Sequence, residues 1–426
     1  MVGMDTLKLV LALGASLDFD MVKLDTREAY LSTSVDDVDA YYARRPPGVR
    51  SSELPYTMKP ACFTYGHPLA SKKFRALLVK ILSKVGARPS NYDVSLYTLD
   101  SALGRALVPT TVDDMPTMYS GGASMLNFLK VGLSEVLEVT CDDPLLTVLG
   151  MELTRDRSAK TTTLRQRGAQ YSLLDRVTPT WRTDDTESFA RVPKSPSGPL
   201  SAVSKSLSLT SLSKEEHKEL RAGVGELSWI SSTAPDFTFS TRASARRVHC
   251  PHKYDMKELN QVVSCMAGVV RKVKDGLTLG GKETELLLTT DTSYHGLEDL
   301  KSCTGGTVHL NHRTGSNSST CEKHTLTADS AMAAEGIGAH IHMKKVLPTT
   351  YLLEELGLDT KAPAKFYMDS VPFMQTILGD KGPSSRSKHM LIRLQVTKEA
   401  LEAGKIDLLH LRSEHMVADI LTKALH

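Results

Sequence analysis

The chain has 426 residues, of which 41% are hydrophobic and 24% charged, and its formal net charge is +3. That length allows two or three domains with separate cores, at ~100–200 residues per domain, and the composition is that of an ordinary globular protein. The mildly basic charge permits a polyanionic partner without requiring one, and no run reaches the ~18 apolar residues of a membrane span.

The N-terminal apolar run "LKLVLALGAS", residues 7–16, has two interpretations. It resembles a weak signal-peptide core, but the segment before it carries Asp5 and no positive cluster, so we expect a buried helix. The cysteines are far apart and form no CxxC pair, which indicates reduced thiols in an intracellular protein of the cytoplasm or nucleus, not a secreted one. The six are Cys62, Cys141, Cys250, Cys265, Cys303 and Cys321.

Two adjacent aspartates, Asp113 and Asp114, occupy the centre of "RALVPTTVDDMPTMYSGG", residues 105–122. The apolar runs on either side predict a β-hairpin with the acids at its tip. Pro109 and Pro116 flank the pair, and because proline removes ladder donors we expect them to weaken the hairpin. Neighbouring carboxylates repel, so the pair predicts a cation and a third carboxylate, for which Asp25 after the strand-like "DMVKL" is the candidate.

The clearest boundary lies near the middle of the chain. Residues 191–214, "RVPKSPSGPLSAVSKSLSLTSLSK", are rich in Ser and Pro and poor in large apolar residues, which is typical of a linker. Residues 215–275 then form a mostly helical stretch, which opens on a Ser cap followed by early glutamates.

From residue 284 onward the periodicity predicts alternating strands and helices. Three strand-like runs come first, at residues 284–294, 303–312 and 320–327. Helices at 328–347 and 349–357 follow, and then a strand at 364–370. The rest consists of helices at 371–378 and 385–404, a strand at 406–411 and a last helix at 416–425. The order is βββαβαβα. The first three strands are close enough to be antiparallel neighbours, and helical crossovers join the later ones.

Three aspartates fall at the ends of these elements. Asp291 closes the first strand, Asp369 closes the fourth, and Asp419 lies in the first turn of the last helix. Sites in mixed sheets gather at strand carboxyl ends, so the three are expected to meet and to bind a hard divalent cation. Each one alone is equally a common strand-end or helix-capping residue; together they favour the metal site.

Three further groups of residues have both a functional and a structural interpretation. His249, Cys250 and His252 have the character of zinc ligands, but no second Cys/His pair follows at finger spacing, so we expect a surface loop.

Lys388 and His389, on a predicted basic helix, face either nucleic-acid phosphates or solvent. Tyr65 and Gly66 either line a nucleotide pocket or form a turn.

Taken in order, these segments resemble copia-type retrotransposon polyproteins in their reverse transcriptase and ribonuclease H portion. The family's polymerase motifs are matched by "LDTREAYL", "RRPPGV", "FTYGHPLASKKF", "NYDVSLYTL", "TVDDM" and "VLGMELTRD". "GELSWISSTAPDFTFS" is similar to the connecting segment, and "LTTDTSYHG", "KSCTGGTVHL", "FYMDS", "RSKHMLIRLQ" and "VADILTKAL" follow the ribonuclease H order. The resemblance covers almost the whole chain and is thin only between residues 178 and 215.

The resemblance implies a mixed α/β, multidomain protein. A partial polymerase palm would cover residues 1–155 and a thumb remnant 156–190, before the linker at 191–214. A helical connection would follow at 215–280, and a ribonuclease H-like domain at 281–426.

The resemblance also implies RNA-directed DNA synthesis and degradation of the RNA strand of a hybrid. The partners would be an RNA template, a DNA primer and an RNA–DNA hybrid, and the cofactor would be Mg²⁺ or Mn²⁺ in two-metal phosphoryl transfer. For the polymerase, the resemblance implies that Asp25 and Asp113 bind the metals and that Asp114 supports them. For the ribonuclease, it implies Asp291, Asp369 and Asp419. The implied nucleic-acid contacts are Tyr65, Gly66, Lys388 and His389.

Two departures from the family limit these expectations. The family's fingers region precedes the first motif, whereas Met1 lies shortly before Asp25, so we expect weak or absent polymerase activity. The family's Ser-x-x-Glu-Ala-Glu aligns with "TADSAMAA", which puts Ser330 at the expected glutamate. Asp329 or Glu335 would have to replace it, but a one-residue shift turns a helical side chain by about 100°, so we expect both to miss and the ribonuclease to be impaired.

Two rival hypotheses stay open. In the first, the chain is a catalytically inactive retroelement remnant that only binds RNA–DNA hybrid. In the second, it is a metal-dependent nuclease that acts through the C-terminal domain alone.

Overall fold

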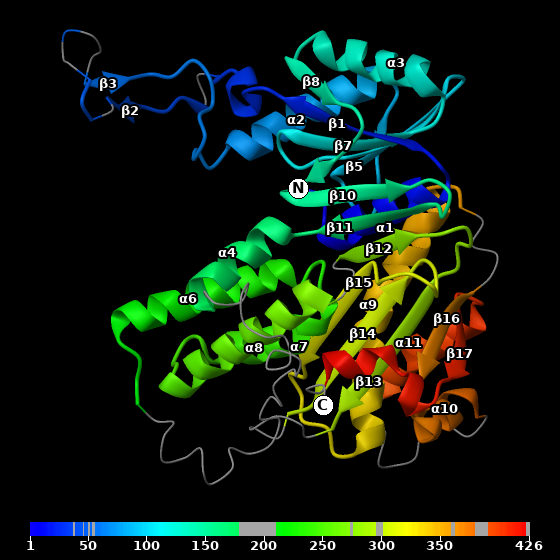
Figure 1. The fold of residues 1–426 in the computed structure, drawn as a ribbon. Helices are drawn as coiled ribbons and strands as arrows, with labels where there is room; N and C mark the ends of the chain where they lie inside the picture. Colours follow the sequence, from blue (N-terminus) through cyan, green and yellow to red (C-terminus); the bar gives the residue numbers. More distant parts are fainter. Residues whose placement is uncertain are drawn as a thin grey trace. The chain divides into compact units, whose positions relative to one another are not determined.

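The computed structural model describes residues 1–36, 39–45, 47–49, 52, 56–178, 210–272, 276–294, 301–358, 363–379 and 391–422. The chain forms two compact units, one of residues 1–10 and 17–149 and the other of residues 11–16 and 150–426. Figure 1 labels most of their helices and strands. The architecture is mixed α/β, as predicted.

The first unit is built on a six-stranded sheet in the order β4-β5-β6-β7-β1-β8. Strand β1 (Asp20–Thr26) pairs antiparallel with β7 (Asp114–Tyr119) on one side and with β8 (Val139–Asp142) on the other. The other strands of the unit are β4 (Arg88–Pro89), β5 (Leu96–Ser101) and β6 (Gly104–Pro109) in the sheet, the small pair β2 (Ala43–Arg44) and β3 (Thr57–Met58), and β9 (Thr147–Val148).

Two helices, α2 (Ala70–Lys84) and α3 (Gly122–Ser134), and the short η1 (Ala29–Ser32) complete this unit. In α2, Phe74, Leu78 and Ile81 recur at helical spacing and are buried in the core that the sheet forms with both helices. Full burial of each such side chain contributes roughly 1.5–3 kcal/mol. This core reaches Leu24 and Met115, the neighbours of the predicted acids along β1 and β7.

The N-terminal helix α1 (Met4–Ser16) is buried along its apolar residues, among them Leu7, Val10 and Leu11. The expectation of a buried helix is therefore confirmed. Within the described residues, no helix is long and apolar enough to cross a membrane.

The second unit begins with an antiparallel sheet and a helical group. Strand β11 (Thr161–Arg165) pairs with β10 (Met151–Asp156) and β12 (Leu277–Gly280). The helices are α4 (Arg167–Val177), α6 (Lys214–Ile230), η4 (Pro235–Phe237), α7 (Thr238–Arg247) and α8 (Lys253–Lys272). Of these, α4, α6, η4 and α8 contribute buried side chains to one apolar core. The predicted Ser cap is confirmed, because Ser213 and Glu216 form a capping box at the start of α6. Residues 191–209 of the predicted linker lie outside the described residues.

The C-terminal sheet has the order β15-β14-β13-β16-β17. Its central strand β13 (Leu287–Ser293) runs antiparallel to β14 (Cys303–His309) and parallel to β16 (Ala364–Met368). The other strands are β15 (Ser318–Lys323) and β17 (Ile406–His410), and the helices are α9 (Ala331–Glu355), α10 (Val371–Leu378), α11 (Leu391–Glu402), η6 (Ser413–His415) and η7 (Val417–Leu421). The predicted strand order, with three antiparallel strands first, is confirmed.

Two helices differ from the prediction. The two helices expected on either side of residue 348 are one helix, because α9 continues through Pro348 with Val346 and Leu352 buried before and after it. Packing of these residues against the core outweighs the backbone hydrogen bond that proline removes. The last segment, η7, is a 3₁₀ helix where an α-helix was expected.

Candidate functional site

Three carboxylates from distant parts of the sequence meet at one edge of the C-terminal sheet. Asp291, Glu335 and Asp369 each offer an oxygen atom, and these atoms lie within 4.8 Å of one another. Asp291 and Glu335 are buried and Asp369 is half-buried. Elsewhere among the residues that the structure describes, no other group of acidic, His or Cys side chains is gathered this closely.

The topology explains why two of these acids meet. Asp291 lies near the carboxyl end of β13, and Asp369 directly follows β16. Because β13 and β16 are parallel neighbours, their carboxyl ends lie at the same edge of the sheet. The predicted meeting of Asp291 and Asp369 is what this arrangement produces.

The third carboxylate corrects an expectation. Glu335 was expected to miss the other acids, and Ser330 was expected at the position of a catalytic glutamate. Instead Ser330 is the N-cap of α9, where its hydroxyl accepts a hydrogen bond from the Ala333 N–H at 3.2 Å. Glu335 lies in the second turn of the helix and completes the cluster, which we call the acidic triad (Asp291, Glu335 and Asp369). A carboxylate is therefore present where the sequence alignment predicted a hydroxyl.

The environment of Glu335 strongly disfavours its charge. Burial, followed by the nearby charges of Asp291 and Asp369, raises the pKa of Glu335 well above its ordinary value, and hydrogen bonds from Thr292 oppose this rise. The Glu335 Oε2 atom is buried, with no hydrogen-bond partner in the described part of the chain. Such a group is stabilised as a carboxylate when a cation joins the site.

Hydroxyl groups hold the other two acids of the triad. Thr422 Oγ1 donates a hydrogen bond to Asp291 Oδ2, and Ser413 Oγ donates to Asp369 Oδ2 at 2.7 Å. Asp419 lies in η7, which packs against β13 and β14, but its carboxylate does not belong to the acidic triad. The structure thus brings together two of the three predicted ribonuclease acids and adds Glu335.

The N-terminal acids are arranged differently. Asp25 lies on β1 directly opposite Asp114, the first residue of β7. Asp113 lies in the turn before β7, and its backbone carbonyl accepts a hydrogen bond from the Thr26 N–H at 3.0 Å. Lys23 places its Nζ 3.7 Å from Asp114 Oδ1. The three acids are neighbours, but their oxygen atoms do not form a cluster as close as the acidic triad.

Burial raises the pKa of both hairpin acids. For Asp113, the charge of Asp25 adds to this rise, while a hydrogen bond from Tyr65 opposes it. For Asp114, a hydrogen bond with Asp25 adds to the rise, and the charge of Lys23 opposes it. This acid group is therefore partly neutralised by the chain itself.

The prolines act on the hairpin as predicted, without abolishing its strands. Pro109 ends β6 and Pro116 lies inside β7. The β6–β7 pairing is confined to the far end of the strands from the turn, at Ala106 with Tyr119 and Leu107 with Met118. Next to the acids, the turn itself is closed by a hydrogen bond of 2.8 Å from the Thr111 N–H to the backbone oxygen of Asp114. Proline thus weakens the ladder next to the acids, and β1 supports β7 from its other side.

The predicted nucleic-acid contacts are only partly described. Tyr65 and Gly66 form a turn, with φ +92° at Gly66, a conformation that favours glycine. The Tyr65 hydroxyl also donates to Asp113 Oδ2 at 3.3 Å, so this turn adjoins the hairpin acids. Lys388 and His389 lie outside the described residues.

The His/Cys cluster of residues 249–252 is a surface loop, as predicted. His249 and Cys250 are exposed, and neither belongs to a group with metal-ligand geometry. The His252 N–H donates to Asp255 Oδ2 at 2.8 Å, so this backbone joins an ion network instead.

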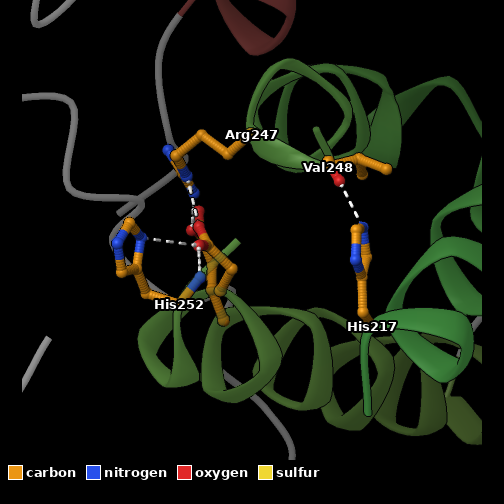
Figure 2. Close-up of polar contacts among 6 residues, drawn as sticks. His217, Arg247, Val248 and His252 are labelled. Atoms are coloured by element: carbon orange, nitrogen blue, oxygen red, sulfur yellow. Dashed lines mark hydrogen bonds and ion pairs between the residues drawn. The ribbon is translucent and has the colours of Figure 1, made fainter. Parts of the chain in front are cut away.

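Figure 2 shows that network between α7 and α8. Arg247 forms ion pairs with the buried carboxylates of Asp255 and Glu258, and His217 Nε2 lies 2.7 Å from the backbone oxygen of Val248. Here a guanidinium satisfies the two acids. We interpret the network as a structural link between helices, because its acids carry their own cation.

Comparisons with known proteins extend along the whole chain. The chain is 26% identical to the retrovirus-related Pol polyprotein from transposon RE1 of Arabidopsis thaliana, over 99% of this chain and 27% of that protein. It is 25% identical to the polyprotein from transposon RE2 of the same plant and 23% identical to that from transposon TNT 1-94 of Nicotiana tabacum, again over 99% of the chain. The chain spans less than a third of the length of these curated relatives. No protein-family model matches.

Solved structures with similar parts have low overall scores. The N-terminal RNase H domain of a Mycobacterium tuberculosis protein is 15% identical, with a TM-score of 0.24, over 33% of this chain and 91% of that one. The prototype foamy virus protease–reverse transcriptase is 12% identical, with a TM-score of 0.22, over 92% of this chain and 43% of that one.

Proposed function

Because this chain is related along its length to the Pol polyproteins of copia-type retrotransposons, we propose that it acts as a metal-dependent ribonuclease on the RNA strand of an RNA–DNA hybrid. The observation that carries this proposal is the acidic triad, whose oxygen atoms lie within 4.8 Å of one another. Close acids at a strand-end edge are suited to hydrolysis of a phosphodiester, since they gather the cations that such a reaction requires.

The residues of the triad fit a hard divalent cation, either Mg²⁺ or Mn²⁺. Their donors are all carboxylate oxygens, which these ions prefer. Glu335 Oε2 is buried with no hydrogen-bond partner among the described residues, so one oxygen is available as a ligand. Asp291, Glu335 and Asp369 would hold the metal, with Asp419 as a further proposed ligand. When bound, the metal would supply Lewis-acid activation of water and neutralise charge on the scissile phosphate.

The chain's own groups prepare this site. Thr422 and Ser413 orient the Asp291 and Asp369 carboxylates by hydrogen bonds, as outer groups commonly do for metal ligands. Burial of Asp291 and Glu335 limits competing water and strengthens electrostatic interaction with a bound cation. The cluster's negative charge also requires a cation before a phosphate can approach.

The test is cleavage of a labelled RNA–DNA hybrid by the full chain with Mg²⁺. We expect cut RNA from the hybrid, little cutting of the same RNA as a single strand, and loss of cutting in Asp369→Asn. Equal cutting by the chain and the variant would show a contaminating nuclease. Absence of cutting by folded protein would refute the proposal and favour the hybrid-binding remnant.

A second proposed activity is RNA-directed DNA synthesis at Asp25, Asp113 and Asp114. It is supported by the register that sets Asp25 opposite Asp114, and by the buried Asp113 Oδ1, which has no hydrogen-bond partner within the described ranges. We propose that this activity is the weaker one, because Lys23 and Tyr65 already engage these acids. Extension of a DNA primer on an RNA template, compared with Asp113→Asn, tests it. Extension that survives in the variant would refute the role of this turn.

A further inference from the structure

The face of the C-terminal sheet that packs against α9 is unusually polar. Thr290 and Thr292 of β13 and Thr304 of β14 lie on it, as does Thr320 of β15. His342 of α9 is fully enclosed, with Nδ1 2.8 Å from Thr290 Oγ1 and Nε2 2.8 Å from Thr320 Oγ1. Buried polar groups of this kind fix one alignment of packed elements, because any slip leaves them without partners.

Glu335 lies at one end of this polar layer. The hydroxyl and backbone N–H of Thr292, the residue after Asp291, favour the charged form of Glu335 and so oppose the rise of its pKa. The helix approaches the strand closely here: a Cβ atom on Gly338, one turn after Glu335, would lie 2.5 Å from Thr292 Oγ1. Glycine at position 338 therefore permits the contact between Thr292 and the start of α9.

The hydrogen bonds continue away from Glu335. Thr292 Oγ1 lies 2.9 Å from Thr304 Oγ1 on the neighbouring strand, and Thr304 Oγ1 contacts His324 Nε2. All three side chains are buried. A hydroxyl has one proton, so if Thr292 donates to Glu335, it accepts from Thr304, which in turn accepts from His324 Nε2–H.

This direction of hydrogen-bond donation agrees with the protonation state of His324. Burial, followed by the charges of Arg393 and Lys301, lowers the pKa of His324 to about 4, so the ring is neutral near pH 7 and carries one proton. Its Nδ1 is buried, with no hydrogen-bond partner in the described part of the protein. A proton on Nε2 therefore satisfies the chain of hydroxyls and leaves Nδ1 as the unprotonated atom.

We propose that Thr292, Thr304 and His324 are positioning residues that hold the Glu335 carboxylate in the orientation needed to bind a divalent cation with Asp291 and Asp369. The inference rests on the proposed metal site and adds residues that touch neither metal nor substrate. Outer residues of this kind orient ligands and commonly change metal affinity by ~10–100-fold.

The experiment measures Mn²⁺ binding by the full chain, using isothermal titration and the electron paramagnetic resonance signal of free Mn²⁺. Thr292→Val keeps the shape of the side chain and removes the hydroxyl, whereas Thr292→Ser keeps the hydroxyl. Thr289→Val is the matched control, since Thr289 is a buried threonine of the same strand whose hydroxyl lies 2.6 Å from Thr307 Oγ1 and outside this chain of hydrogen bonds.

We expect Thr292→Val to weaken Mn²⁺ binding by at least about tenfold, and Thr292→Ser and Thr289→Val to stay within about twofold of the parent. Thr304→Val, which leaves Thr292 in place, should weaken binding less, and it replaces Thr292→Val as the test if that variant does not fold. Unchanged affinity in a folded variant, even with a lower unfolding midpoint, would overturn the inference and leave a purely structural role.

The two proposals fail in different ways. Mn²⁺ binding that depends on Thr292 without cleavage of hybrid would refute the ribonuclease and support the positioning role. Absence of Mn²⁺ binding by the parent chain would overturn both the metal site and the positioning role.

Discussion

The two acidic groups of this chain differ in what surrounds them. The hairpin acids Asp113 and Asp114 lie above an apolar core, with Lys23 and Tyr65 as polar neighbours. The acidic triad lies beside a polar layer, and the groups that act on Glu335 are two further carboxylates and Thr292. In the first group Lys23 and Tyr65 partly offset the repulsion between the acids, whereas in the second the two other acids raise the pKa of Glu335. Paired carboxylates in a sequence are therefore weaker evidence for a metal site than acids from distant elements that the fold gathers within 4.8 Å of one another.

The largest expected effect comes from neutralising the triad. Glu335→Gln keeps the size of the side chain and removes its charge, so we expect hybrid cleavage to fall roughly 10³-fold, a loss similar to that of other groups that stabilise charge in a transition state. The control is Asp329→Asn, an exposed acid just before the same helix, which should change cleavage by less than about twofold. Equal losses in both variants would contradict the assignment of Glu335.

Glu335→Gln is also expected to change the stability of the fold. Without metal, the three acids repel one another, so Glu335→Gln is expected to raise the urea midpoint of unfolding while it removes activity. A lower midpoint in metal-free buffer would mean that the charge of Glu335 stabilises the fold, contrary to its crowded environment.

The next prediction concerns how stability depends on pH through His342, in the polar layer between α9 and the C-terminal sheet. Burial lowers the pKa of His342 to about 4 from the ordinary 6.5. As pH falls below 6.5 the unfolded chain takes up a proton that the folded chain does not, so stability is lost down to about pH 4, by about 3 kcal/mol in total. His342→Leu should therefore flatten the pH dependence of the unfolding free energy in this window, measured by urea unfolding and circular dichroism.

A residual slope is expected in that variant, because burial also lowers the pKa of His324 to about 4. An unchanged slope in His342→Leu would show that His342 is protonated in the folded protein, and would contradict the neutral polar layer.

The smallest effect is predicted in the hairpin group. Lys23→Met removes the ammonium that lies 3.3 Å from Asp142 and 3.7 Å from Asp114. Because these side chains are partly exposed to solvent, we expect a loss of about 1 kcal/mol or less in unfolding free energy. A loss of several kcal/mol would mean that this ion pair is far more important to the fold than its exposure indicates.

The order of elements in residues 284–411 was predictable from the sequence, because strand and helix periodicities there are clear, whereas the six-stranded sheet of the first unit was not predicted strand by strand. Asp291 and Asp369 were predictable for the same reason, since both lie near the carboxyl ends of neighbouring strands. Glu335 was not, because its place depends on where α9 begins, and that is set by the cap at Ser330. One signal was available: Glu335 is the only charged residue in "AMAAEGIGAHIH". The continuation of α9 through Pro348 depends on tertiary packing, which local propensity does not contain.

The central claim is that the acidic triad binds the catalytic metal. The most direct test is anomalous diffraction from crystals of the full chain soaked in MnCl₂. We expect Mn²⁺ density bounded by Asp291, Glu335 and Asp369. Strong density at Asp25 and Asp113 with none at the triad would contradict it.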